Sequence, residues 1–161
     1  MSTLYGSQAT KVLNTAIPKL VEQGYKGGSI KCISDKYDLS VAAATLLTGD
    51  IIRMGGKIPE GARIVNFKLI VPDLDSGSSV LLSAGWLASD DAVEAVNGTG
   101  FASSITTGQA GGVYDMFVSA PTATGMQKVF SAEVQPTVTC TLQGSSVVTG
   151  VIYMEIEYVI D

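Results

Sequence analysis

The alternation of apolar and polar residues near the carboxyl end of this chain constrains its fold most strongly. In residues 130–142 the even positions are all apolar and the odd positions are all polar. Residues 148–160 repeat the pattern, with Glu155 and Glu157 opposite a row of aliphatic and aromatic side chains. A period of two is typical of a strand with one buried face. Because residues 143–146 have the composition of a hairpin turn, we expect these two strands to pair antiparallel.

Three residues within such patterns have specific expectations. Pro136 has no N–H to donate to a neighbouring strand, so we expect a break, a bulge or a sheet edge there. Cys140 lies on the apolar side of the same strand and is predicted to be a small core residue. Trp86 shares an alternating face with Val80, Leu82 and Ala84, which predicts a core position rather than a ligand-stacking one.

Shorter stretches of strand character precede these two, separated by turns such as Pro59-Glu60-Gly61 and Asp75-Ser76-Gly77. They cover residues 30–34, 37–43, 50–57, 62–71, 79–86, 101–106 and 113–118. One helix is predicted over residues 90–96, with Ser89 as its N-cap and two aspartates in its first turn. The chain is therefore predicted to be all-β, an antiparallel β-sandwich or jelly roll of about eight or nine strands.

The first 29 residues differ from the rest. They show no clear period, yet they hold too many apolar side chains for a free tail, namely Leu4, Tyr5, Val12, Leu13, Ile17, Leu20 and Val21. We predict an extended N-terminal arm over residues 1–29 that docks on a surface, followed by a β-sandwich domain over residues 30–161.

Charge also divides the chain, at a point slightly further along. The net charge is −5, but residues 1–36 hold five lysines against two acids, and residues 37–161 hold five basic and thirteen acidic groups. The basic segment is suited to lie across an acidic surface, its own or a neighbour's, and the alternative is a solvated lysine-bearing arm. The residues predicted to bind a partner are Lys11, Lys19, Lys26 and Lys31.

Composition excludes several kinds of chemistry. The chain has no histidine, so a Ser-His-Asp or Cys-His arrangement and any histidine metal site are impossible. Met54-Gly55-Gly56-Lys57 lacks the first glycine and the final Ser or Thr of a phosphate-binding loop. Asp73 could begin a calcium loop, but its twelfth position is Ala84 where a glutamate is needed. We expect no catalytic, cofactor-binding or metal-binding residues.

The acidic balance also argues against nucleic acid as a partner, and aromatic residues do not interleave with basic ones. No run of 18 apolar residues and no leader pattern is visible, so we expect no membrane span and synthesis in a cytoplasm. Cys32 and Cys140 are then expected to stay reduced, with a bridge between them as the less favoured alternative.

Three stretches together carry a family resemblance. They are Leu47-Thr-Gly-Asp50-Ile-Ile-Arg-Met54-Gly-Gly-Lys-Ile-Pro59-Glu-Gly-Ala-Arg63-Ile-Val65, the strand that ends in Gly85-Trp86, and Thr149-Gly150-Val-Ile152-Tyr-Met154-Glu-Ile156-Glu-Tyr158-Val159. Over residues 30–161 the chain resembles the capsid decoration, or cement, proteins of tailed bacteriophages.

This resemblance implies a non-enzymatic β-sandwich that is assembled in the host cytoplasm, binds the major capsid protein lattice on the virion exterior and stabilises it. It also implies a homo-oligomer, a trimer or else a dimer, and a terminal arm that reaches across the shell. The competing hypothesis is a receptor- or carbohydrate-binding sandwich from a head fibre or tail adhesin, because jelly rolls also host sugar sites. Tyr114 and Phe117 are the aromatic residues that such a site could use.

Overall fold

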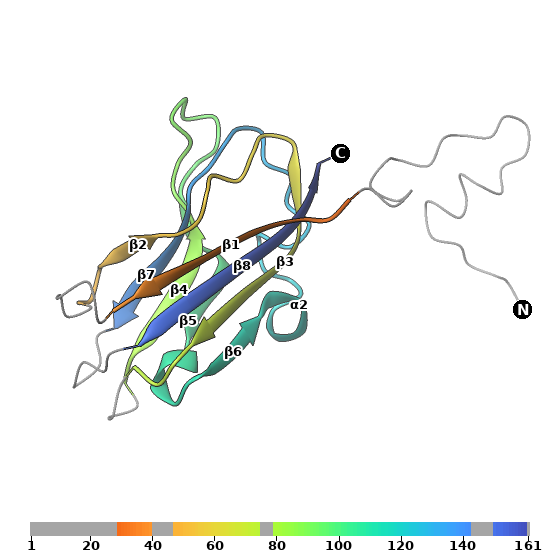
Figure 1. The fold of residues 1–161 in the computed structure, drawn as a ribbon. Coiled ribbons are helices and arrows are strands. Elements are labelled where there is room, and N and C mark those ends of the chain that lie inside the picture. Colours follow the sequence, from red (N-terminus) through yellow and green to blue (C-terminus); the bar gives the residue numbers. More distant parts are fainter. Residues whose placement is uncertain (1–28, 40–46, 75–78, 143–149, 161) are drawn as a thin grey trace, which may run out of the picture.

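The computed structural model describes residues 29–39, 47–74, 79–142 and 150–160, which form two facing β-sheets (Figure 1). The strands are β1 (Lys31–Asp38), β2 (Ile51–Arg53), β3 (Ala62–Val71), β4 (Leu81–Trp86), β5 (Asn97–Ile105), β6 (Gly112–Asp115), β7 (Pro136–Leu142) and β8 (Val151–Ile160). Two single turns of helix flank β6, η2 (Thr107–Gln109) and α2 (Met116–Ser119). No helix in this part of the chain is long and apolar enough to cross a membrane.

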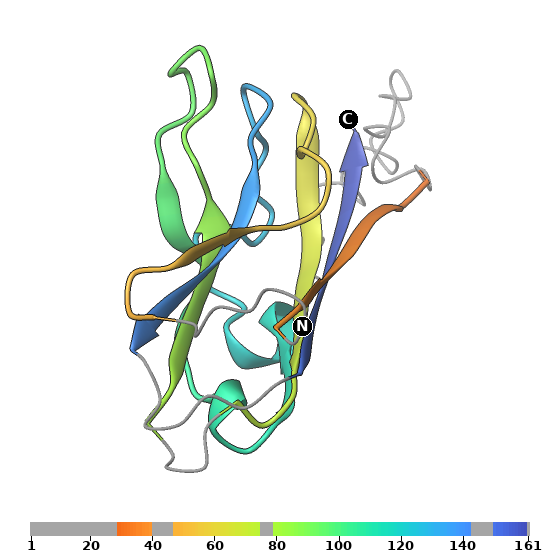
Figure 2. The same ribbon diagram turned by 60° about the vertical axis from the view of Figure 1, so that its left-hand side comes forward.

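The strand order identifies the sandwich as a jelly roll. One sheet has the order β1-β8-β3-β6 and the other β2-β7-β4-β5, and every pairing is antiparallel. First pairs with eighth, second with seventh, third with sixth and fourth with fifth, as in one long hairpin wound around a common core. Figure 2 shows the two layers from the side. The all-β prediction is confirmed.

The hairpin predicted for the last two strands is wrong. β7 pairs with β2 and β4, whereas β8 lies in the other sheet between β1 and β3. Both edges of each strand are therefore occupied by partners from distant parts of the sequence. Turn composition reports that the chain changes direction, not whether it returns to the same sheet. The connection at residues 143–149 lies outside the described residues.

The break predicted at Pro136 is confirmed, because β7 begins with that residue. Proline fits the first position of a strand, where its missing N–H costs no ladder hydrogen bond. The preceding residues alternate in burial but join the sheets only through an isolated bridge between Val134 and Ile58.

The helix predicted over residues 90–96 is absent, and that prediction is wrong. The segment is a tight loop between β4 and β5 in which Ala92 has φ +60°, outside the helical region. The Ser89 hydroxyl accepts a hydrogen bond from the Glu94 N–H at 2.9 Å, and the Asp91 carboxylate accepts from the Ser89 hydroxyl at 2.6 Å. The predicted capping groups are thus used within the loop, whose ends are held together by the pairing of Trp86 with Asn97.

Aromatic side chains fill the space between the sheets. Trp86 is 2% exposed, and its ring lies 5.2 Å from that of Phe101 and 5.0 Å, edge-on, from that of Phe130. A Cβ on Gly85 would lie 1.9 Å from the Asn97 carbonyl oxygen, and one on Gly100 would lie 2.0 Å from the Trp86 ring. These glycines let β5 approach closely enough to cover the indole. Core positions are confirmed for Trp86 and for Cys140, which is fully buried.

Candidate interaction face

Only one of the four lysines predicted to bind a partner lies in the described part of the chain. Lys31 is exposed at the start of β1, opposite Tyr158. Lys11, Lys19 and Lys26 lie outside the described residues, so the structure does not bring the four together. Among the described residues no group of three or more histidine, cysteine or acidic side chains could hold a metal ion.

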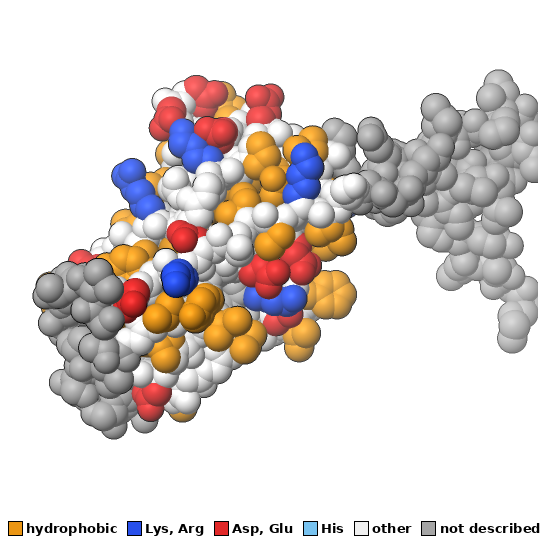
Figure 3. Space-filling view, in the orientation of Figure 1, with side chains coloured by type: hydrophobic (Ala, Val, Ile, Leu, Met, Phe, Trp, Pro, Cys, Tyr) orange, Lys and Arg blue, Asp and Glu red, His pale blue; other side chains and the backbone are white. Residues whose placement is uncertain are grey.

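The most distinctive surface is the outer face of the β1-β8-β3-β6 sheet, which we call the outer face. Strand register aligns Tyr153 on β8 with Ile70 on β3, and Ile70 with Val113 on β6. These three residues, the apolar row, are 46%, 46% and 59% exposed. Adjacent strands are about 4.8 Å apart, so the three side chains form one continuous strip. Lys36 on β1 continues the same row at the sheet edge. Figure 3 shows hydrophobic and charged side chains side by side on this face.

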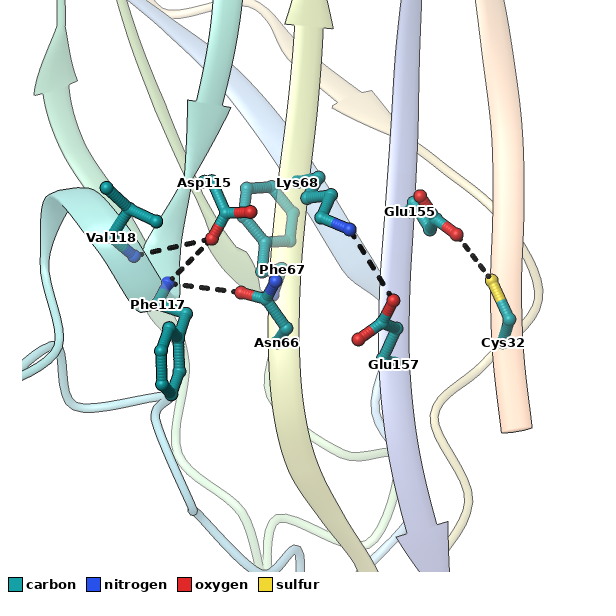
Figure 4. A network of polar contacts seen from close by, with 9 residues as sticks. All are labelled: Cys32, Asn66, Phe67, Lys68, Asp115, Phe117, Val118, Glu155 and Glu157. Carbon is teal, nitrogen blue, oxygen red and sulfur yellow. Dashed lines mark hydrogen bonds and ion pairs between the residues drawn. The ribbon is translucent and has the colours of Figure 1, made fainter. Parts of the chain in front are cut away.

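A charged row runs beside the apolar row. It contains Ser34, Glu155, Lys68 and Asp115, one from each strand of the sheet. The Lys68 ammonium is 3.6 Å from the carboxylate of Glu157 in the following row, as Figure 4 shows. The Cys32 thiol is 3.5 Å from Glu155. Partial desolvation, together with the nearby Glu155 carboxylate, raises the pKa of the Cys32 thiol, which makes it a weak nucleophile.

The short helix α2 is fixed to the outer face by two side chains. Asp115 caps it by accepting hydrogen bonds from the Phe117 and Val118 N–H groups. Asn66, placed by a bulge in β3, accepts a second hydrogen bond from the Phe117 N–H at 3.1 Å (Figure 4). The Phe117 and Val118 side chains are left 64% and 76% exposed.

The surface has two depressions near the outer face and α2. One, of about 520 Å³, lies on the outer face and is lined in part by Lys36, Lys68, Ile70 and Tyr153. The other, of about 640 Å³, lies between β5 and α2 and is lined mainly by serine and threonine hydroxyls together with Tyr114.

Tyr114 is not an exposed aromatic. It is 7% exposed, and its hydroxyl donates to the Phe101 carbonyl at 3.1 Å. Burial, and then the negative charge of Asp115, raise the pKa of the Tyr114 hydroxyl. The expectation that Tyr114 could serve a carbohydrate site is therefore wrong, and of the two candidates only Phe117 can stack on a ligand.

Residues 57–63, part of the stretch that resembles cement proteins, join loops at one end of the sandwich. The Lys57 ammonium lies 2.8 Å from Asp90 and 3.1 Å from Glu133, and hydrogen bonds to these two carboxylates raise its pKa. Gly61 has φ +75°, which a turn before β3 requires of it. These positions therefore have structural roles, and Lys57 is engaged by carboxylates rather than free for a phosphate.

Sequence reasoning missed the outer face, although a signal was present. On β3 and β8 the polar positions should face solvent, yet Ile70 and Tyr153 occupy such positions. An apolar residue at an outward position of an otherwise alternating strand marks a surface that something else can cover.

No protein-family model matches this chain, and no curated protein matches it. Among solved structures, a chain in the capsid of Ralstonia phage GP4 is similar with a TM-score of 0.67 and 23% identity, over 83% of this chain and 86% of that chain. A chain in the capsid asymmetric unit of cyanophage Pam1 is similar with a TM-score of 0.63 and 16% identity, over 92% of this chain and 96% of that chain. At these identities the similarity establishes a shared fold.

Proposed function

We propose that this protein is a structural component of a phage virion that binds the outside of the capsid lattice and stabilises it, without catalysis. One observation carries the proposal: the jelly roll is shared with chains of two phage capsids over most of both partners' lengths. The shared unit thus spans most of this chain and most of each of the two capsid chains. The cement-like stretches at residues 47–65 and 149–159 point to the same class.

The physical requirements of a cement protein are modest, and this chain meets them. It must add buried area across several subunit contacts at once, because multivalent attachment to a repeating lattice converts weak single contacts into firm binding. A rigid core with an exposed apolar strip on one sheet supplies such a surface. This role requires neither a histidine nor a metal ion. The chain has no histidine, and its described residues contain no group of side chains that could hold a metal ion.

The proposal includes the exterior of the virion as the location and a homo-oligomer as the attached form. A trimer would present three copies of one face to a lattice position of matching symmetry, and a dimer is the alternative. Sedimentation equilibrium of the free protein distinguishes the two.

The direct test is co-sedimentation of the purified protein with expanded capsids that lack it, from the phage that encodes this chain. We expect saturable binding at a fixed ratio to the shell subunit and a higher capsid melting temperature by calorimetry. Capsids already carrying the protein are the matched control, because their sites are filled. Absence of co-sedimentation at every salt concentration from low to physiological would refute the proposal.

A further inference from the structure

The outer face leaves apolar surface uncovered, and the part of the chain that precedes β1 has the composition to cover it. We propose that residues 1–28 fold back over the outer face of the β1-β8-β3-β6 sheet of their own molecule while the protein is free. This inference concerns the free protein and does not depend on the proposed role in a virion.

The first support is the shape of the face. Tyr153, Ile70 and Val113 form a strip across three neighbouring strands, beside a depression of about 520 Å³. Phe117 and Val118 on α2 lie on the other side of the charged row. Soluble proteins rarely leave several large apolar side chains together in water, so such a strip favours an occupant with apolar side chains.

The second support is complementarity between the face and the segment. Residues 1–28 carry three lysines and one glutamate, together with nine large apolar or aromatic side chains. The rows described above place three acids on the outer face, Glu155, Glu157 and Asp115, against two lysines, Lys36 and Lys68. The described residues as a whole carry twelve acidic and seven basic groups. Apolar residues interspersed with lysines therefore match an apolar strip that lies beside a row containing Glu155 and Asp115, on a domain with a net negative charge.

The third support is reach. β1 is an edge strand of the same sheet, and it begins at Lys31 opposite Tyr158. Tyr153 lies five positions back along β8, about 17 Å away at the rise of a strand. Twenty-eight residues extend to roughly 90 Å, far more than this. Gly24, Gly27 and Gly28 directly before β1 permit the required change of direction.

The outer face could be covered by residues 1–28 of the same molecule or by those of a second copy. The covalent connection to β1 favours the same molecule. A covalent connection of this length keeps a segment near its own domain, at an effective concentration on the order of millimolar. That exceeds the concentration of a second copy in a dilute solution, so the segment is expected to occupy its own molecule's face.

The test uses trypsin cleavage after Lys11 and Lys19 in the full-length protein, followed by mass spectrometry. When opening is fast, the cleavage rate reports the fraction of molecules in which the segment is undocked. We expect the double variant Ile70→Ser/Tyr153→Ser to be cleaved about tenfold faster than the wild type. Ile51→Ser is the matched control, because Ile51 is an isoleucine of similar exposure on the outward side of β2 in the opposite sheet. It should be cleaved at the wild-type rate.

A second variant keeps the test decisive if the double variant folds poorly by circular dichroism. Glu155→Gln/Glu157→Gln leaves the apolar row intact, and it should speed cleavage at low salt and lose its effect at high salt. Wild-type cleavage as fast as that of a synthetic peptide of residues 1–28 would overturn the proposal. So would protection that disappears on dilution, since that outcome assigns the face to another molecule's segment.

Discussion

The solvent-facing sides of the two sheets carry different kinds of side chain at the outward positions of their strands. On the β2-β7-β4-β5 sheet, β7 turns Thr137, Thr139 and Thr141 outward, and the Thr141 hydroxyl donates to the Leu81 carbonyl at 3.1 Å. Ser83 on β4 accepts from the Ser104 N–H at 2.9 Å and is 1% exposed. On these two central strands the hydroxyls bond to the backbone of their own sheet, and the exposed outward Ile51 and Arg53 lie on the edge strand β2. On the β1-β8-β3-β6 sheet, the corresponding positions hold apolar and charged side chains that extend into solvent.

The comparison shows that alternation alone does not define an outward surface. A threonine face is self-contained, because its hydroxyls are short and bond locally. A face of tyrosine, isoleucine and glutamate leaves contact area and charge available to another chain. The first kind of surface completes a fold, whereas the second is suited to binding.

The largest loss of stability is expected from a change at Trp86, whose side chain lies in the core between the two sheets. Trp86→Ala removes the ring that packs on Phe101 and Phe130, and the free energy of unfolding should fall by about 3–5 kcal/mol. Urea denaturation measures this change. The control is Phe117→Ala, an exposed aromatic on α2 whose loss should be nearly neutral. Equal losses for the two variants would contradict a single shared core.

The second prediction separates the two sheets. Asn66→Ala removes an acceptor of the Phe117 N–H, and Ser83→Ala removes the acceptor of the Ser104 N–H. Each change should cost about 1–3 kcal/mol of stability. Amide hydrogen exchange should rise at Phe117 in the first variant and at Ser104 in the second. Faster exchange at both sites in either variant would show that the two surfaces are coupled.

The third prediction concerns pH and a site at the end of the sandwich. Glu94 is buried, which alone would raise its pKa, but the Ser131 N–H at 2.7 Å and the Lys128 ammonium at 3.0 Å outweigh burial and lower it. A carboxyl with a lowered pKa in the folded state contributes stability above its unfolded pKa and loses it as pH falls through the folded value.

Below about pH 4.5, therefore, wild-type protein should lose part of its stability advantage over Glu94→Gln. Melting temperature measured against pH for the two proteins tests this, and parallel curves would contradict it. The result also sharpens the comparison, because it places an acid-sensitive contact between the β4–β5 loop and residues 128–131, outside both outer surfaces.

The smallest stability effect is expected where one surface is made to resemble the other. Tyr153→Thr places a threonine in the apolar row and should change the free energy of unfolding by no more than about 0.5 kcal/mol, since the side chain is half exposed. Urea denaturation measures this, with Thr139→Val in the threonine face as the reciprocal variant. A loss above about 2 kcal/mol for Tyr153→Thr would show that this side chain supports the fold itself.

Strand positions were the most predictable part of this fold. The predicted strand at residues 62–71 coincides with β3, and the apolar side of residues 130–140 is buried as alternation requires. Pairing was not predictable from the same signal, since the neighbours of β7 and β8 come from distant segments. The loop after Trp86 carries good capping residues but forms no helix, because Ser89, Asp91 and Glu94 bond to one another within a loop whose ends are held by strand pairing.

The candidate site likewise has features that the sequence predicts and features that depend on the tertiary structure. The amino-acid sequence by itself determined the β class, the separation of a basic segment from an acidic body, and the exclusion of histidine chemistry. Only the tertiary structure decided that Ile70, Val113 and Tyr153 lie in one row, because their alignment depends on the register of three strands. Period-two patterning is a local property that each strand carries alone, whereas register and sheet membership arise when distant strands bury their apolar sides against a common core.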